Sequence, residues 1–298
     1  MIINGGISVI GAGTMGNGIA HVFAQAGFKV TIVDVSLSQL DKAVANITKN
    51  FDRQIAKGIA TEEQKKTALA HITIESNLIE GVKNAALVVE AATENVALKL
   101  NIFEQLDSYA PKDAILATNT SSISITRIAA VTNRSSKVIG MHFMNPVPVM
   151  KLVEIINGYA TSQEVTDTIV ELSKQLGKVP CVVNDYPGFI SNRILMPMIN
   201  EAIYSLYEGV AGVEEIDTVM KLGMAHPMGP LQLADFIGLD VCLSILHVLH
   251  DGFGNPKYAP CPLLVNMVTA GKLGVKSGEG FYTYPAGSKE LVVSGRFT

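Results

Sequence analysis

The chain has 298 residues, 48% of them hydrophobic, with 23 Lys and Arg against 27 Asp and Glu. This length exceeds what one hydrophobic core usually fills, so we expect two domains. A formal net charge of −4 without a basic block argues against a nucleic acid as partner. The 3 cysteines lie far apart without the spacing of a metal site, which predicts free thiols and no bound metal. No basic leader and no long apolar run is visible, so we expect a cytoplasmic protein that does not bind membranes.

Short apolar runs alternate with helix-length segments from residue 7 to about residue 184, as in a parallel sheet covered by helices. The predicted strands are Ile7–Ile10, Val30–Asp34, Ile72–Ile74, Leu87–Glu90, Ile115–Thr118, Val138–His142, Leu152–Ile156 and Val179–Val183. Between the last two strands, a capping signal at Ser162 and a stop at Gly177 indicate a helix.

The strand signals end at residues 185–188, and a helical spacing of apolar residues follows to about Gly271. The first of these helices is expected to carry one apolar stripe, made of Ile190, Ile194, Met198, Ala202 and Leu206. We therefore predict an α/β protein: a Rossmann-type, doubly wound, mainly parallel sheet followed by an all-helical C-terminal domain. The expected divisions are residues 1–186, 187–284 and a loosely held tail, 285–298, to which we assign no function.

A glycine-rich loop, Gly11-Ala12-Gly13-Thr14-Met15-Gly16, stands between the first predicted strand and a helix. Its first glycine suits a tight turn, its second the close approach of a pyrophosphate, and its third the packing of helix on strand. Free N–H groups at the start of a helix bind phosphates, so we expect this loop to contact a dinucleotide. The second strand ends in Asp34, whose carboxylate can accept from ribose hydroxyls. No arginine is near Asp34, which favours NAD over NADP; the alternative is a plain glycine turn with Asp34 capping the next helix.

His142 ends one predicted strand, and Glu154 lies in the next, beyond a turn that contains Pro146 and Pro148. Two strands joined at their ends can bring an imidazole and a carboxylate together. A carboxylate on one ring nitrogen fixes the tautomer and raises the basicity of the other, as a general acid/base requires. The alternative is a core histidine bonded to backbone, with Glu154 a solvated charge at a strand end.

Further polar residues follow predicted strands at their carboxyl ends, where ligands of open α/β sheets bind. Glu94 and Lys99 could line the nicotinamide ribose, or else belong to a solvated helix start. Ser121 could offer its hydroxyl to a substrate or cap the next helix, but it lacks the G-x-S-x-G setting of a hydrolase nucleophile. Asn192, early in the long second-domain helix, has an amide that a ligand or a backbone carbonyl would satisfy.

Together these residues make the sequence resemble the L-3-hydroxyacyl-CoA dehydrogenases, most closely the short bacterial 3-hydroxybutyryl-CoA dehydrogenases. The resemblance extends from Ile7 to Tyr284. Besides the glycine loop, it rests on the motifs Glu90–Glu94, Ala117–Ser122, Gly140–Pro146, Asp185–Arg193, His226–Pro230, Asp235–Asp240 and Lys276–Tyr282. One departure is Met144, which stands where the family usually has a second phenylalanine.

The resemblance implies a reversible, NAD-dependent oxidation of (S)-3-hydroxybutyryl-CoA, or a similar short-chain 3-hydroxyacyl-CoA, to acetoacetyl-CoA or the matching 3-ketoacyl-CoA. It implies that His142 is the catalytic base and Glu154 its electrostatic partner, while Ser121 and Asn192 hydrogen bond to the substrate. The implied cofactor contacts are Gly11, Gly13, Thr14, Met15, Gly16, Asp34, Glu94, Lys99, Ser121 and Asn145. The resemblance also implies a homodimer formed through the helical domain and a place in fatty acid or butanoate metabolism.

Lys49, Arg53 and Lys57 are spaced four residues apart on the helix after Asp34 and would share one face. They could bind the phosphates of coenzyme A, or they could be a solvated row of charges. Three other functions remain open: an enzyme of the same reaction that prefers NADP, a β-hydroxyacid dehydrogenase acting on a free acid, and a non-catalytic dinucleotide-binding protein. The second typically uses a lysine in the long helix, where this chain has Asn192-Arg193.

Overall fold

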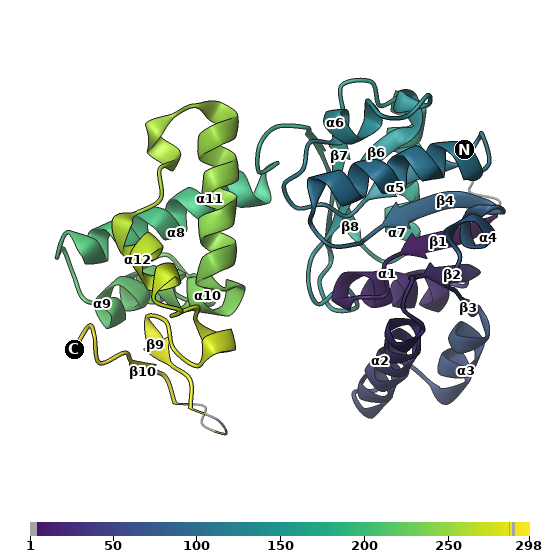
Figure 1. The fold of residues 1–298 in the computed structure, drawn as a ribbon. Helices are drawn as coiled ribbons and strands as arrows, with labels where there is room; N and C mark the ends of the chain where they lie inside the picture. Colours follow the sequence, from purple (N-terminus) through teal and green to yellow (C-terminus); the bar gives the residue numbers. More distant parts are fainter. Residues whose placement is uncertain (1–4, 286, 288–289) are drawn as a thin grey trace. The chain divides into compact units, whose positions relative to one another are not determined.

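The computed structural model describes residues 5–285, 287 and 290–298, and the chain divides into two compact units, residues 1–186 and 187–298. The first unit contains an eight-stranded sheet with strand order β3-β2-β1-β4-β5-β6-β7-β8 (Figure 1). The strands are β1 (Gly6–Ile10), β2 (Val30–Val33), β3 (Ile72–Glu75), β4 (Ala85–Glu90), β5 (Ile115–Thr118), β6 (Val138–Phe143), β7 (Leu152–Asn157) and β8 (Val179–Asn184). Every predicted strand is present, and the prediction of a Rossmann-type, mainly parallel sheet is confirmed.

Helices connect these strands and pack against the sheet (Figure 1). They are α1 (Thr14–Gln25), α2 (Leu37–Ala56), α3 (Glu62–Ala70), α4 (Leu78–Val82), α5 (Val96–Tyr109), α6 (Ile125–Ala129) and α7 (Gln163–Gln175), with a short 3-10 helix at Ser135–Lys137. One core cluster joins α1, α2 and α7 to the apolar side chains of the central strands. Within β4, Leu87, Val88 and Val89 are all buried, because a parallel sheet is covered on both faces.

One strand pair breaks the parallel pattern. β6 and β7 are antiparallel, and their register places His142 directly opposite Glu154. Side chains of directly opposed residues lie on the same face of a sheet. The short connection between the two strands, with its two prolines, therefore determines that these two side chains meet.

The second unit is built mainly of helices: α8 (Ser191–Tyr207), α9 (Val213–Thr218), α10 (Pro230–Ile237), α11 (Leu239–Phe253) and α12 (Pro262–Thr269). A π-helical segment, Val219–Gly223, follows α9, and 3-10 helices form at Pro256–Tyr258 and Val275–Ser277. Among the described residues, no single helix is long and apolar enough to cross a membrane; α10 and α11 together have that length and composition but meet at 97°.

The apolar stripe predicted for α8 is wrong in part. Ile190 and Ile194 are 49% and 66% exposed, and the buried apolar side chains of the helix are Met196, Ile199, Ala202 and Ile203. The reason is geometric. Residues spaced four apart drift by roughly 40° per step around a helix of 3.6 residues per turn, so such a row leaves the core face within a few turns.

Residues 290–298, within the predicted tail, are also more ordered than we expected. β10 (Val292–Val293) pairs antiparallel with β9 (Tyr282–Thr283), so the second unit is not purely helical. Ser294 is buried, its N–H donates to the carbonyl of Phe281 at 2.9 Å, and the ring of Phe297 lies 5.8 Å from that of Phe281. The apolar cluster near the C-terminus therefore packs onto the helical unit.

Two buried aspartates hold the loops of the second unit. Asp217 accepts from the N–H groups of Leu231 and Gln232, in the first turn of α10, and from the hydroxyl of Tyr282. Asp235 accepts from the N–H groups of Phe281 and Tyr282 and from the hydroxyl of Tyr284. A Cβ on Gly229 would lie 2.2 Å from Asp217, and one on Gly280 would lie 1.9 Å from Asp235, so both loops require glycine at these points.

Candidate active site

The glycine loop between β1 and α1 lines a cavity of about 520 Å³ in the first unit. Gly11 has a φ of +101°, and a Cβ on it would lie 2.7 Å from the carbonyl oxygen of Ala91. A Cβ on Gly16 would lie 1.7 Å from the carbonyl oxygen of Gly11, whereas a Cβ on Gly13 would meet nothing within 4 Å. Of the three glycines, Gly13 alone faces open space, which is what the approach of a pyrophosphate to the backbone requires.

Asp34 follows β2 at the same cavity. Its Oδ2 accepts from the N–H of Ala12 and its Oδ1 from the N–H of Ser36, each at 2.9 Å. These bonds fix the carboxylate beside the glycine loop, and each oxygen has a further lone pair for a ribose hydroxyl. Thr14 and Met15 form the first turn of α1. The described residues that line this cavity include neither Lys nor Arg, so they fit a dinucleotide whose adenosine ribose carries no phosphate.

The structure brings His142, Glu154 and Ser121 into one row. The Oε2 of Glu154 lies 2.9 Å from Nδ1 of His142, and the Oγ of Ser121 lies 3.0 Å from its Nε2. His142 is 7% exposed and Glu154 is 2% exposed. Because a carboxylate only accepts, the proton on Nδ1 belongs to the bond with Glu154, and Nε2 is left as the acceptor that faces the serine hydroxyl. This is the tautomer of a general base that takes a proton from a hydroxyl group.

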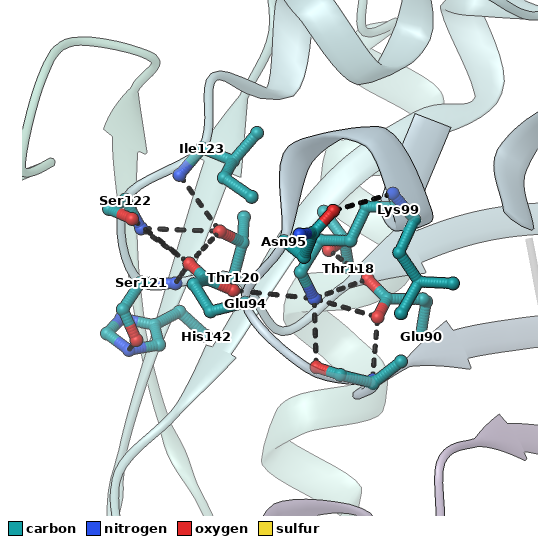
Figure 2. A network of polar contacts seen from close by, with 12 residues as sticks. Glu90, Glu94, Asn95, Lys99, Thr118, Thr120, Ser121, Ser122, Ile123 and His142 are labelled. Carbon is teal, nitrogen blue, oxygen red and sulfur yellow. Dashed lines mark hydrogen bonds and ion pairs between the residues drawn. The ribbon is translucent and has the colours of Figure 1, made fainter. Parts of the chain in front are cut away.

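Ser121 lies in the loop after β5, and Glu94 holds that loop (Figure 2). Oε1 of Glu94 accepts from the hydroxyl of Thr120, from the N–H of Ser121 at 3.0 Å, and from the N–H and the hydroxyl of Ser122 at 3.2 and 3.1 Å. In the same loop, Oδ1 of Asn119 accepts from the N–H of Phe143 at 2.8 Å, which connects the loop to β6 beside His142. The loop that carries Ser121 is thus held by the carboxylate of Glu94 and by the side-chain amide of Asn119.

Lys99, expected to contact the cofactor, is completely buried. Its Nζ donates to both oxygens of Glu90, at 2.7 and 2.9 Å, and to the carbonyl of Ala92 at 3.2 Å (Figure 2). Glu94 lies further out, with a side chain 40% exposed and its Oε2 3.4 Å from Nζ. The structure therefore places the ammonium of Lys99 in an ion pair below the loop surface, and a contact of Lys99 with the cofactor stays a prediction.

A smaller cavity, of about 230 Å³, lies between α1, α2 and the loop that joins β6 to β7. Lys49 and Arg53, one turn apart on α2, line it together with Asn145. Lys57 is the C-cap of α2 and does not line this cavity. The structure thus groups two of the three predicted basic residues with Asn145.

Asn192 belongs to the second unit, where it lies in the first turn of α8. Its expected contact with a substrate stays a prediction. In the described residues, no three His, Cys, Asp or Glu side chains are grouped in a way that could hold a metal ion.

Sequence reasoning assigned no role to Glu90, Thr118, Asn119 or Thr120. The Oε2 of Glu90 accepts from the hydroxyl of Thr118 at 2.7 Å, and its Oε1 accepts from the N–H of Ala92 at 2.7 Å. One signal was available. Each of these side chains ends or follows a strand whose other residues are apolar, and a polar group in that position is buried and must be paired.

Comparisons with known proteins show which family the chain resembles. The family model described as "3-hydroxyacyl-CoA dehydrogenase, NAD binding domain" matches residues 6–186, and that of the C-terminal domain matches residues 188–284. A probable 3-hydroxybutyryl-CoA dehydrogenase of Bacillus subtilis is 56% identical over 278 residues, which cover 93% of this chain and 96% of the relative. A 3-hydroxybutyryl-CoA dehydrogenase of Bradyrhizobium diazoefficiens is 54% identical over 93% of this chain and 94% of its own. The solved structure of (S)-3-hydroxybutyryl-CoA dehydrogenase from Ralstonia eutropha has a TM-score of 0.91 and 50% identity, covering 94% of this chain and 98% of that chain.

Proposed function

Because the chain belongs to the 3-hydroxyacyl-CoA dehydrogenase family, and is therefore an oxidoreductase, we propose that it oxidises (S)-3-hydroxybutyryl-CoA reversibly to acetoacetyl-CoA, with NAD as cofactor. Other 3-hydroxyacyl-CoA substrates with short chains are included in this proposal. The relatives named 3-hydroxybutyryl-CoA dehydrogenase support the choice of substrate. The observation that carries the chemistry is the row in which Nε2 of His142 faces a hydroxyl while Glu154 holds Nδ1.

His142 acts as the general base in this proposal. Its Nε2 takes the proton of the substrate hydroxyl, and in the reverse direction it returns that proton to the oxygen at C3. Glu154 accepts from Nδ1–H throughout, so it orients the ring and stabilises the imidazolium that proton transfer creates. Ser121 hydrogen bonds to the same oxygen or to the imidazole. NAD, when bound, supplies the hydride acceptor, and the glycine loop with Asp34 would hold it.

The mechanism is tested by His142→Ala and Glu154→Gln, each compared with wild type in the reduction of acetoacetyl-CoA by NADH. We expect kcat to fall by about 10²-fold or more in each, because proton transfer by a positioned group contributes that much. His71→Ala is the matched control, since His71 precedes the edge strand β3 and lies away from β6 in the strand order. Near-normal turnover in either test variant would overturn the assigned roles.

The substrate class is tested by the wild-type protein alone. Acetoacetyl-CoA should be reduced, and free acetoacetate should be a poor substrate. Efficient turnover of the free acid would instead identify a β-hydroxyacid dehydrogenase. If neither compound were turned over, the protein would be a non-catalytic dinucleotide-binding protein. For the cofactor, we propose a preference for NAD, because the described residues that line the cavity at Asp34 offer no cation for a ribose phosphate. An equal kcat/KM with NADPH would contradict that preference.

Coenzyme A is proposed to bind with its phosphates at Lys49 and Arg53, whose cavity also contains Asn145. A phosphate contact made by Arg is charge-assisted, and Arg53 is exposed to solvent, which weakens such a contact. Arg53→Ala should therefore raise the KM for acetoacetyl-CoA by about 5- to 10-fold, with little change in kcat. Lys57→Ala is a suitable control, because Lys57 does not line this cavity. An equal effect of both substitutions would show that only the general charge of α2 matters.

The protein is further proposed to be a homodimer that assembles through its second unit. Several large apolar side chains there are exposed, among them Val210, Leu222 and Phe236. Exposed apolar surface of this kind commonly marks a protein contact. Sedimentation as a monomer at micromolar concentration would contradict the dimer. A cytoplasmic location stays a prediction.

A further inference from the structure

In the first unit, a single carboxylate oxygen accepts hydrogen bonds from the polar groups of the Ser121 loop. All four hydrogen bonds to Oε1 of Glu94 come from Thr120, Ser121 and Ser122 (Figure 2). Three consecutive residues of a loop are thus fixed to one point. The middle residue of the three presents its hydroxyl to Nε2 of His142, at 3.0 Å.

Glu94 would be a weak anchor by itself, because its side chain is 40% exposed and has several rotatable bonds. Its second oxygen, however, lies 3.4 Å from the ammonium of Lys99. Lys99 is 0% exposed, and two strong bonds to Glu90 determine where its charge lies. A buried ammonium attracts a nearby carboxylate more strongly than one in water does.

Glu90 in turn connects two loops. Its Oε1 accepts from the N–H of Ala92, which lines the dinucleotide cavity, and its Oε2 accepts from the hydroxyl of Thr118, at the end of β5. The row Glu90–Lys99–Glu94 therefore runs from the ends of β4 and β5 to the Ser121 loop. Each charge in it has an opposite neighbour, as a buried ionic network requires.

We propose that Glu94 is a positioning residue for proton transfer: it sets the Ser121 hydroxyl against His142, and the buried Glu90–Lys99 ion pair fixes the place of its carboxylate. This inference rests on the proposed function, because it concerns the base of that reaction. It differs from the role predicted for Glu94 as a cofactor contact. A cofactor contact would act on the binding of NADH, whereas a positioning residue acts on the chemical step.

The test measures kcat and the KM for NADH in Glu94→Ala and Glu94→Gln. Loss of the acceptor in Glu94→Ala should lower kcat by about 10²-fold and leave KM within about 3-fold, since misplacement of a reacting group by 1 Å has that order of effect. Glu94→Gln keeps an oxygen for the four donors but loses the attraction of Lys99, so its kcat should lie between those of Glu94→Ala and wild type, about 10-fold below wild type. A raised KM at unchanged kcat in Glu94→Ala would overturn the proposal. Asp113→Ala is the matched control, because it removes a carboxylate from an exposed pair with Lys137.

A double-mutant cycle shows whether Glu94 acts through Ser121. If it does, Glu94→Ala combined with Ser121→Ala should lower kcat no further than Ser121→Ala alone. The proposal would be overturned if the fall in kcat of the double variant equalled the product of the two single falls, or if Ser121→Ala had a normal kcat. The double variant Glu90→Gln/Lys99→Met removes both buried charges at similar volume. It should lower kcat by about 10-fold while Glu94 itself is intact, and a normal kcat would contradict the role of the ion pair.

A spectroscopic measurement separates this inference from the proposed function. In a protein with ¹⁵N-labelled histidine, the signal of His142 is identified by its absence in His142→Asn. Its Nε2 shift should change in Ser121→Ala and should change in the same direction in Glu94→Ala. An Nε2 shift in Glu94→Ala equal to that of wild type would overturn the positioning role. If the wild type reduced no acyl-CoA, the proposed function would fail, and this shift would still decide the role of Glu94.

Discussion

The two units of the protein bury charge in different ways. In the first, Glu90 pairs with Lys99 and Asp107 with Arg134, at 2.7 and 2.8 Å. In the second, Asp217 and Asp235 are each 1% exposed, and the described residues place neither of them in an ion pair. Both aspartates accept instead from backbone N–H groups and tyrosine hydroxyls.

This difference determines how each unit responds to change. In an ion pair each charge stabilises the other, so both groups stay charged over a wide pH range. Removing one partner leaves the other charge buried without compensation, which destabilises the fold. An acid held by neutral donors has no such compensation, and burial raises the pKa of Asp235 to about 6. The first unit should therefore be sensitive to substitution of its charges and the second to pH.

The largest effect is expected from Lys99→Met, which leaves the buried Glu90 without its cation. Such a change costs about 3–5 kcal/mol, and here it should destabilise the first unit. Hydrogen exchange measured on peptides of β4 and β5 would show where the protein has lost stability. Glu90→Gln in the same chain should restore most of the protection, and wild-type exchange in Lys99→Met would show that the pair contributes no stability.

A second prediction concerns His21, a buried titratable side chain of the first unit for which the described residues show no ion pair. Burial lowers its pKa to about 4, and its ring stacks on Phe51 with centroids 4.2 Å apart. Between about pH 6.5 and pH 4, His21 is protonated in the unfolded chain but neutral in the folded protein. The contribution of neutral His21 to the free energy of unfolding is therefore complete above pH 6.5 and is lost as the pH falls toward 4. The loss is about 1.4 kcal/mol per pH unit and about 3 kcal/mol in all. His21→Leu should flatten the pH dependence of protection in α1; an unchanged slope would refute the assignment.

Asp235 should give the second unit the opposite trend. Its folded pKa, about 6, lies above the usual 3.8, so the folded unit holds a proton that the unfolded chain releases. This contribution is complete below pH 3.8 and is lost as the pH rises through 6, with a total of about 3 kcal/mol. The test is the protection of α10 against hydrogen exchange at pH 5 and at pH 7, corrected for intrinsic exchange rates. The difference between the two pH values should be smaller in Asp235→Asn than in wild type. Parallel pH trends of α1 and α10 in wild type would break the contrast between the units.

The smallest effect is expected from Tyr282→Phe, which removes one of the three donors of Asp217. Loss of a hydrogen bond to a buried charged group costs about 1.5–3 kcal/mol, and the low end applies because two N–H donors remain. Tyr284→Phe provides the matched comparison. The hydroxyl of Tyr284 lowers the pKa of Asp235, so its removal should shift the pH response of α10 upward, which Tyr282→Phe should do far less. Equal pH responses of the two variants would contradict this.

The sheet could be predicted because its information is local. Runs such as Leu87–Val89 are apolar throughout and short, which identifies a strand covered on both faces. The glycine loop was equally predictable, since Gly11 and Gly16 reflect close contacts of the backbone with its immediate surroundings, and Gly13 leaves open space beside the backbone. The buried face of α8 was misjudged because a row of residues spaced four apart drifts around the helix, so that Ile190 and Ile194 lie off the face that meets the core. The tail was misjudged because its apolar cluster gains a partner only when β9 is in place.

The sequence by itself determined the family, the α/β architecture, the glycine loop with Asp34, and the candidate pair His142 and Glu154. The family follows from the resemblance of several motifs to a known family, and the other features follow from periodicity, motif spacing and one short strand connection. Only the tertiary structure decided that Glu90 pairs with Lys99, that Glu94 holds the Ser121 loop, and that Lys57 does not line the cavity of Lys49 and Arg53. The partners in those contacts come from different strands, helices and loops. The three-dimensional position of a carboxylate, and not its place in the chain, decides which donors it accepts.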